Sequence, residues 1–180
     1  MPETTELKEE IKIPNGVEVS MEEKTIHVKS EKGSLSKILS HPKINIKIKD
    51  NIVEISCSKS PHRKEKALIG TFSAHIRNMI KGVTEGFEYK MKTLYSHFPI
   101  KTIVEGNEFI IQNFLGERSP RKAKILENVE VKTMGDNVTV SGIDKEKVGQ
   151  TVANIERATR VKKRDIRVFQ DGVYLISKRG

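Results

Sequence analysis

The sequence predicts an α+β fold built from two tandem, duplicated domains, each with small antiparallel β-sheets packed against one α-helix. Two observations carry this prediction. Alternating apolar residues, typical of strands, occur once in each half, and each such segment is followed by apolar residues at helical spacing. The glycines at positions 82 and 86 bracket the end of the first helix. We therefore expect an N-terminal repeat over residues 1–83 and a C-terminal repeat over residues 84–180.

A β-hairpin is predicted in each half of the chain. Residues 44–56 read INIKIKDNIVEIS, and residues 129–141 read VEVKTMGDNVTVS. Apolar residues occupy every second position in both segments, which places one face on a core and the other in water. An Asp-Asn pair, at 50–51 and at 136–137, is expected to form each turn because both residue types tolerate a left-handed backbone.

An amphipathic helix is predicted after each hairpin. The first covers about residues 64–81 and the second about 144–160, with Asp144 as the N-cap of the second. Further strands are expected upstream of the hairpins, over residues 17–19, 25–29, 87–95 and 108–112. After the second helix we expect a basic loop at 162–164, a short strand at 166–168 and a last strand at 173–176.

Composition and charge reduce the number of protein classes to which the chain could belong. The 180 residues carry a formal net charge of +9 and include one cysteine, which excludes a disulfide framework. No run approaches the roughly 18 apolar residues of a membrane span, so a soluble, cytoplasmic protein without a membrane partner is expected. The charge is uneven: residues 1–23 carry −5, residues 24–85 +8, residues 86–156 zero and residues 157–180 +6. Excess Lys and Arg favours nucleic acid as the partner.

The chain lacks the residue spacings of common catalytic sites. Its five histidines and single cysteine show no H-x-x-x-H or C-x-x-C spacing, and no glycine-rich phosphate-binding motif is present. We therefore expect no enzymatic activity, no metal, no cofactor and no small-molecule substrate. One enzymatic alternative stays open, an RNA-processing hydrolase that uses His62, His75 or His97 with a nearby lysine.

Two basic segments are candidates for RNA binding. The recognisable cores of the RNA-recognition motif and the KH domain are absent, so the argument depends on charge and placement. The main candidates belong to the C-terminal segment: Arg157, Arg160, Lys162, Lys163, Arg164, Arg167, Lys178 and Arg179. Possible secondary contacts are Lys59, Arg63, Lys64 and Lys66, which lead into the first helix, although a solvated helix face would look the same. Phe169 and Tyr174 could stack on bases, but burial in the sheet is the preferred interpretation.

Four segments of the chain form recognisable motifs. They are residues 164–174, which read RDIRVFQDGVY, residues 68–87 continued by Tyr89, Lys90 and Met91, residues 95–100 and residues 148–150. Together they resemble the universal L-six family of large-subunit ribosomal proteins, in its archaeal and eukaryotic form, and residues 164–174 look like that family's C-terminal signature. One departure is Arg157, where many members carry Gln, and this change adds a cation beside an already basic loop.

The resemblance implies a function. Members are non-enzymatic, use no cofactor, and bind large-subunit rRNA mainly through the C-terminal domain, near the sarcin–ricin loop where translation factors dock. Other large-subunit ribosomal proteins are further implied partners. The resemblance places the RNA contacts in the C-terminal signature, whereas the assignment of any one cation to a phosphate is our inference. A free-standing RNA-binding or RNA-chaperone protein is the alternative within binding proteins.

Overall fold

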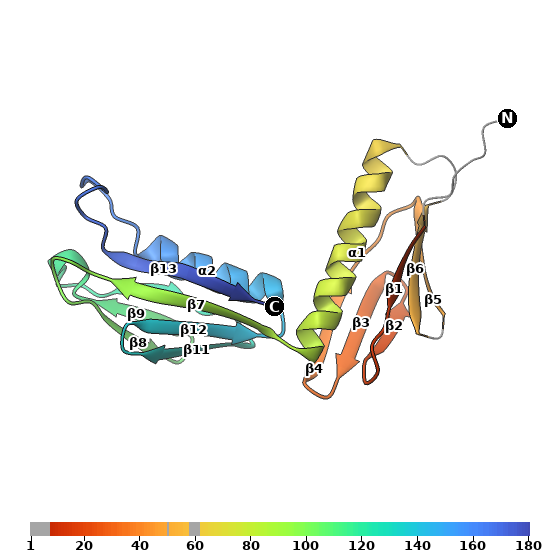
Figure 1. Ribbon diagram of the computed structural model, residues 1–180, viewed down its shortest axis with the longest axis horizontal. Coiled ribbons are helices and arrows are strands. Elements are labelled where there is room, and N and C mark those ends of the chain that lie inside the picture. The colour runs from red at the N-terminus through yellow and green to blue at the C-terminus, as the bar shows by residue number, and fades with distance from the viewer. Residues whose placement is uncertain (1–7, 50, 58–61) are drawn as a thin grey trace. The chain divides into compact units, whose positions relative to one another are not determined.

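The protein has the α+β fold that the sequence predicts. A computed structural model describes residues 8–49, 51–57 and 62–180, and it shows small antiparallel sheets packed against α-helices (Figure 1). The chain divides into two compact units, the first ending at Glu85 and the second spanning Gly86–Gly180. Each unit contains one α-helix within the described residues. No helix among those residues is long and apolar enough to cross a membrane.

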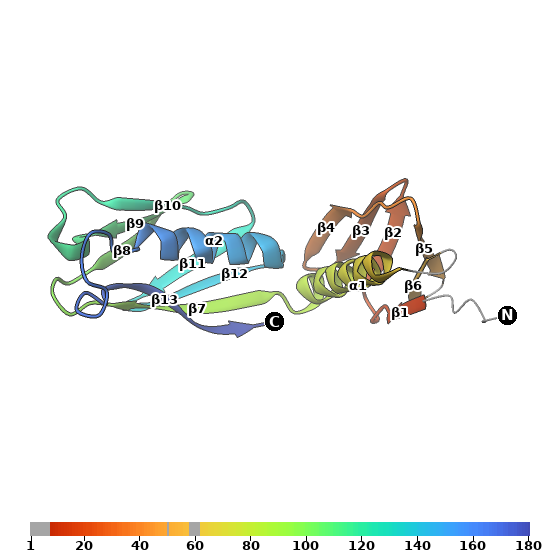
Figure 2. The same ribbon diagram turned by 90° about the horizontal axis from the view of Figure 1, so that it is seen from above.

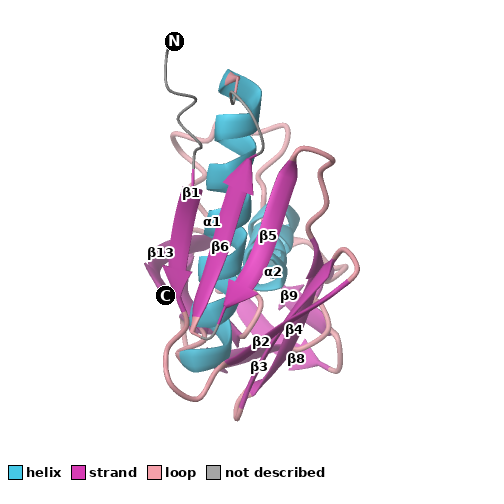
Figure 3. Ribbon diagram, turned by 90° about the vertical axis from the view of Figure 1, so that its right-hand side faces the viewer, coloured by secondary structure: helices cyan, strands magenta, loops and turns pink. Residues whose placement is uncertain are grey.

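The N-terminal unit packs helix α1 (Arg63–Thr84) against two three-stranded antiparallel sheets (Figure 3). The sheets have the strand orders β1-β6-β5 and β2-β3-β4. Their strands are β1 (Lys8–Lys12), β2 (Glu18–Glu22), β3 (Thr25–Ser30), β4 (Gly33–Ile38), β5 (Ile44–Lys49) and β6 (Ile52–Cys57). Ile69, Ile76 and Val83 of α1 are fully or almost fully buried, and they share one core with Ile26 of β3 and Ile55 of β6. This spacing of apolar residues is what selects a helix here.

The C-terminal unit packs helix α2 (Lys145–Ala158) against a four-stranded and a three-stranded antiparallel sheet, as Figure 2 shows from above. The strand orders are β11-β12-β7-β13 and β10-β9-β8. The strands are β7 (Phe87–Leu94), β8 (Lys101–Glu105), β9 (Glu108–Gln112), β10 (Arg121–Lys124), β11 (Val129–Met134), β12 (Asn137–Gly142) and β13 (Gly172–Arg179). A short 3-10 helix, η1 (Phe114–Gly116), lies between β9 and β10.

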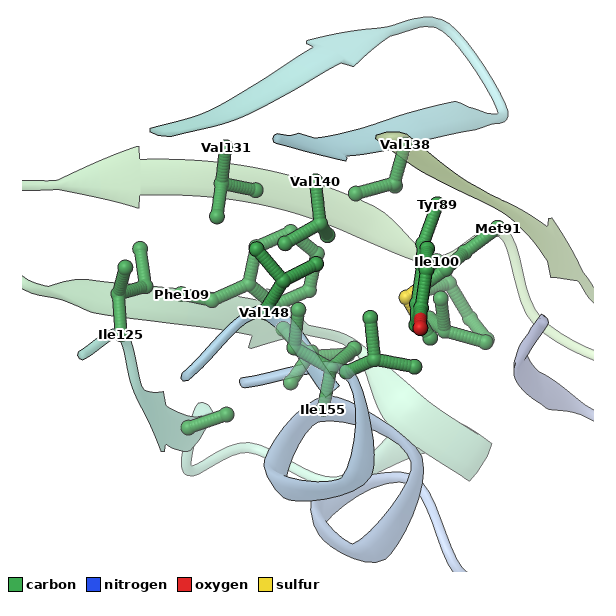
Figure 4. Close-up of a cluster of buried hydrophobic side chains, with 14 of the residues drawn as sticks. Tyr89, Met91, Ile100, Phe109, Ile125, Val131, Val138, Val140, Val148 and Ile155 are labelled. Atoms are coloured by element: carbon green, nitrogen blue, oxygen red, sulfur yellow. The ribbon is translucent and has the colours of Figure 1, made fainter. Parts of the chain in front are cut away.

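One stripe of α2 forms the centre of the C-terminal core. Val148 and Ile155 are both 0% exposed, and they point at Phe109 and at the inward side chains of the larger sheet (Figure 4). The helix begins where the sequence predicts, because the Asp144 carboxylate accepts hydrogen bonds from the backbone N–H groups of Glu146 (2.9 Å) and Lys147 (3.5 Å). It ends at Ala158, two residues before the expected limit.

Both predicted hairpins are present, as β5–β6 and β11–β12. The second turn differs from the prediction by one residue. Asn137 pairs with Met134, so the two turn residues are Gly135 and Asp136 rather than Asp136 and Asn137. Gly135 has φ 60°, a left-handed conformation that glycine adopts without a Cβ penalty, and this places the turn. Of the first turn, Asp50 lies outside the described residues.

The prediction of a short strand at 166–168 is wrong, because these residues form a turn. The Asp165 carboxylate accepts a hydrogen bond from the Arg167 N–H (2.9 Å), and the Asp165 carbonyl accepts from Val168 (3.2 Å) and Phe169 (2.9 Å). These local bonds satisfy the donors that a strand would need. The last strand, β13, is instead longer than expected at both ends and pairs antiparallel with β7.

Candidate nucleic-acid interface

The basic loop of the C-terminal unit, residues 159–171, is anchored where it leaves α2. Thr159 is buried, its hydroxyl lies within hydrogen-bond reach of the Ile155 (3.3 Å) and Glu156 (3.2 Å) carbonyls, and its oxygen accepts from the Val173 N–H (3.2 Å). One side chain thus ties the end of the helix to β13, on the far side of the loop.

Arg121 of β10 holds the same end of the helix from the other side. Its guanidinium donates to the carbonyl of Ala158 (3.0 Å), one of the last carbonyls of α2, which a helix end leaves without a partner, and to the carbonyl of Arg160 (3.1 Å) in the loop. It also forms a bidentate pair with Glu117 and lies 4.2 Å from the centre of the Phe114 ring. Hydrogen bonding from Arg121 lowers the pKa of the Glu117 carboxyl. Arg121, itself held by Glu117, therefore fixes the backbone position of Arg160.

The other end of the basic loop is anchored by Asp171, which is 0% exposed. One carboxylate oxygen accepts from the backbone N–H (3.2 Å) and hydroxyl (3.3 Å) of Ser96 and lies 3.4 Å from Nδ1 of His97. The His97 ring stacks on Phe169, with 4.4 Å between ring centroids. The Arg164 guanidinium lies 4.7 Å from the Phe169 centroid. A buried acid thus supports a stack that ends in an exposed arginine.

Within the loop, backbone geometry reverses the chain. Lys163 has φ 59°, in the left-handed region. The Gln170 amide donates to the Arg167 carbonyl (3.3 Å), and the Tyr174 hydroxyl donates to the Gln170 carbonyl (3.1 Å). Because hydrogen bonds hold both ends and the middle of the loop in place, the loop loses little conformational entropy when it binds a partner.

Six of the eight main candidates lie together at this end of the C-terminal unit. They are all exposed: Arg157, Arg160, Lys162, Lys163, Arg164 and Arg167. Within the described part of the chain, the only ion pair of this group is a long one, 3.9 Å, between Arg167 and Asp165. We call these six residues the loop cluster. Their charges are left to solvent or to a partner.

Lys178 and Arg179 do not belong to the loop cluster. They lie at the far end of β13, beside Tyr89 and Glu88 at the start of β7, whereas the loop enters at Gly172 (Figure 1). Six residues of strand correspond to about 20 Å. An irregularity between Leu175 and Ser177 leaves Lys178 beside the inward-facing Tyr89, with its ammonium 5.7 Å from the ring centroid. The structure therefore divides the predicted site in two.

The secondary basic segment is only partly described. Lys59 lies outside the described residues, while Arg63, Lys64 and Lys66 are exposed in the first turn of α1. Glu65, between them, turns inward and accepts a 2.8 Å bond from Lys43, which lowers the pKa of the Glu65 carboxyl. The cations therefore face solvent at the N-terminal end of a helix, where backbone N–H groups also favour anions.

The two aromatic side chains do not follow the preferred interpretation. Neither Phe169 nor Tyr174 is buried within the sheet: Phe169 precedes β13 and lies in the stack with His97, and Tyr174 is 44% exposed on β13. Both line a cavity of about 680 Å³ between α2 and the loop, with Arg157 and Arg160 also in its wall. Sequence reasoning missed this cavity. The spacing of Ala153 and Arg157 on one face of α2 was the available signal.

Two of the three histidines of the enzymatic alternative take structural positions. His75 on α1 lies 3.1 Å from Lys37 on β4, a contact between helix and sheet, and His97 belongs to the Asp171 anchor. His62 is exposed just before α1. Among the described residues, no group of three or more His, Cys, Asp or Glu side chains could hold a metal ion.

Comparison with known proteins decides the family. The sequence profile described as ribosomal protein L6 matches residues 13–86 and residues 98–172. The chain belongs to the ribosomal protein L6 family. The resemblance found in the motifs is thereby confirmed, and the two matched segments agree with the predicted duplication. This is a family of structural ribosomal proteins rather than enzymes, so we set the hydrolase alternative aside.

Two curated relatives of the L6 chain come from archaea, in agreement with the archaeal-type motifs. Large ribosomal subunit protein uL6 of Methanococcus vannielii is 49% identical over 180 residues, which are 100% of this chain and 98% of that protein. Large ribosomal subunit protein uL6 of Methanobrevibacter smithii is 51% identical over 172 residues, 96% of each chain.

Proposed function

We propose that this L6 protein is a structural constituent of the large ribosomal subunit, bound to ribosomes in the cytoplasm. It binds large-subunit rRNA chiefly through its basic C-terminal domain. The observation that carries the proposal is the loop cluster, six exposed cations at the end of α2 and on the anchored loop that follows it, in a chain about half identical to proteins named as large ribosomal subunit proteins. Other large-subunit ribosomal proteins are its expected neighbours.

The loop cluster suits a folded RNA better than a particular base sequence. Its cations can each neutralise a phosphate, and phosphate contacts fix register and orientation without reading bases. The Arg164 guanidinium lies 4.7 Å from the centre of the Phe169 ring, and its planar fork of N–H donors suits a phosphate. Recognition of this kind follows the shape of one folded RNA.

We assign the remaining basic residues to separate contacts. Lys178 and Arg179 would meet a different RNA segment or a protein neighbour, because β13 separates them from the loop cluster. Arg63, Lys64 and Lys66, with Lys59 from outside the described residues, would provide a secondary contact from the N-terminal domain. We place the whole interface near the sarcin–ricin loop and the translation-factor site, which is what the motif resemblance implies.

Cosedimentation tests the proposal. Cell extract containing the tagged protein is centrifuged through a gradient at moderate salt, and the fractions are compared with those of an established large-subunit protein. We expect the protein to follow large subunits and polysomes. A protein that stays at the top of the gradient while subunits remain intact would contradict the ribosomal assignment and favour the free-standing RNA-binding alternative.

A further inference from the structure

The cavity between α2 and the basic loop has a wall formed by one face of the helix. Ala153, Glu156 and Arg157 line it from α2, at the spacing of residues that share one helix face, and Arg160 adds to the lining just beyond the end of the helix. Ala153 is the smallest of these side chains. The volume of about 680 Å³ falls in the roughly 300–1,000 Å³ range of small-ligand sites.

The rest of the lining is apolar and aromatic. Val161, Ile166 and Phe169 come from the loop, and Val173 and Tyr174 come from β13. Ile166 and Tyr174 have 69% and 44% of their surfaces exposed. Exposing a branched aliphatic side chain and a tyrosine beside a hollow leaves apolar area that an inserted group would cover.

The rim of the cavity is cationic. Arg157 and Arg160 border it, and the other cations of the loop cluster continue from it along the loop. The acid in the wall, Glu156, is engaged with β13, since its carboxylate accepts a 3.1 Å hydrogen bond from the Leu175 N–H. The site therefore combines an apolar interior with a rim that attracts anions.

We propose that this cavity holds one unpaired nucleotide of the bound RNA, with the base stacked on Tyr174 and its phosphate on Arg157 and Arg160. Phe169 lines the cavity as well, but His97 and Arg164 already cover its ring. The inference rests on the proposed function and names the occupant of one part of its interface. A nucleotide has both required parts, a planar apolar face and an anionic group, and proteins recognise RNA by stacking unpaired bases on aromatic side chains.

Charge selects RNA over a protein side chain as the occupant. An aliphatic or aromatic side chain of a neighbouring protein could fill the interior, but it would leave the two arginines and the adjoining cations unpaired. A polyanion satisfies the rim and the rest of the loop cluster together. The loop is already fixed by Thr159, Asp171 and Tyr174, so the cavity exists before the nucleotide enters.

A cavity-filling variant tests the inference without removing any charge. Large subunits are reconstituted with the full-length wild-type protein, with Ala153→Phe, or with the control Ala74→Phe, which makes the same change at an exposed position of α1 away from Arg63–Lys66. Unpaired bases in the large-subunit rRNA are then probed by chemical modification. We expect wild type and control to protect one unpaired nucleotide that Ala153→Phe leaves reactive. The variant's affinity should fall about tenfold, the equivalent of losing one base stack.

An Ala153→Phe protein that protects the same nucleotides with wild-type affinity would overturn the inference. A wild-type protein that neither associates with the rRNA nor protects it would overturn the proposed function itself, so the two failures are distinguishable. Thermal unfolding of each variant confirms that it is folded.

A second measurement leaves the cavity unfilled. A photoreactive benzoylphenylalanine replaces Ile166 beside the cavity, or Ile38, 73% exposed in the N-terminal unit, as the control. In assembled subunits the probe at position 166 should crosslink to one unpaired nucleotide that the control does not reach. Crosslinks to a ribosomal protein or to base-paired nucleotides would refute the assignment.

Discussion

Removing half of the loop cluster should flatten the salt dependence of rRNA binding. The triple replacement of Lys162, Lys163 and Arg164 with Ala removes three of six exposed cations that lie at one end of the C-terminal unit. None of the three is paired with a carboxylate within the described residues, so little folded-state stability should be lost with them. The replacement also removes the contact between the Arg164 guanidinium and the Phe169 ring.

The magnitude follows from counterion release. Each phosphate contact with double-stranded nucleic acid contributes about −0.9 to the slope of log affinity against log salt. Six contacts give a slope near −5.4, which is about a 2,000-fold loss of affinity between 50 and 200 mM salt. Three contacts give about −2.7, or roughly a 40-fold loss over the same range.

Filter binding or fluorescence anisotropy with a large-subunit rRNA fragment, over a salt series, measures the slope. The matched control replaces Lys24, Lys29 and Lys32, three exposed lysines of the N-terminal unit, with Ala. It removes the same net charge away from the loop cluster and should keep the wild-type slope. A triple loop variant with an unchanged slope would refute the reasoning and move the interface elsewhere, with Arg63 to Lys66 as the next candidate.

Three further predictions concern stability. Ile155→Ala, at a 0% exposed position, should lower the free energy of unfolding by about 2–5 kcal/mol in urea titrations. Asp144→Ala removes the N-cap of α2 and should cost about 0.5–2 kcal/mol by the same assay. Because Arg121 lowers the pKa of Glu117, the pair stabilises the fold above the unfolded-state pKa of Glu117, and this contribution is lost as pH falls through the folded-state value. Glu117→Gln should therefore lose less stability on acidification than wild type.

Each of these predictions has a clear contrary result. An unchanged unfolding midpoint for Ile155→Ala would mean that the packing of α2 on the core contributes little to stability. Wild-type stability of Asp144→Ala would show that other groups satisfy the first N–H donors of α2. A Glu117→Gln protein that follows the wild-type pH dependence would remove the Arg121 pair as an acid-sensitive contact.

The strong periodic patterns of the sequence were sufficient to predict the centre of each unit. Alternation over residues 44–56 and 129–141 specifies register because a slip of one residue would turn every apolar side chain outward. The four strands that were not predicted, β1, β4, β8 and β10, all lie at sheet edges. Short segments such as RKAK of β10 become strands through pairing with a neighbour and carry little signal of their own.

The candidate site could be predicted only in part. Lys162, Lys163 and Arg164 are adjacent in sequence, so their proximity required no tertiary information. The position of Lys178 away from them depends on the length of β13, and the pattern at 166–168 was misleading because Asp165 closes a turn there. The His97–Phe169 stack joins residues distant in sequence, and the cavity depends on how the loop folds back from α2 to β13, so only the folded chain shows either.

Residue-level mapping of protein–RNA crosslinks in assembled large subunits is the most direct test of rRNA binding by the C-terminal unit. We expect crosslinks to large-subunit rRNA concentrated on the loop cluster, from Arg157 to Arg167, with fewer at Lys178 and Arg179. Crosslinks confined to the N-terminal unit, or a C-terminal unit that contacts only protein, would contradict it.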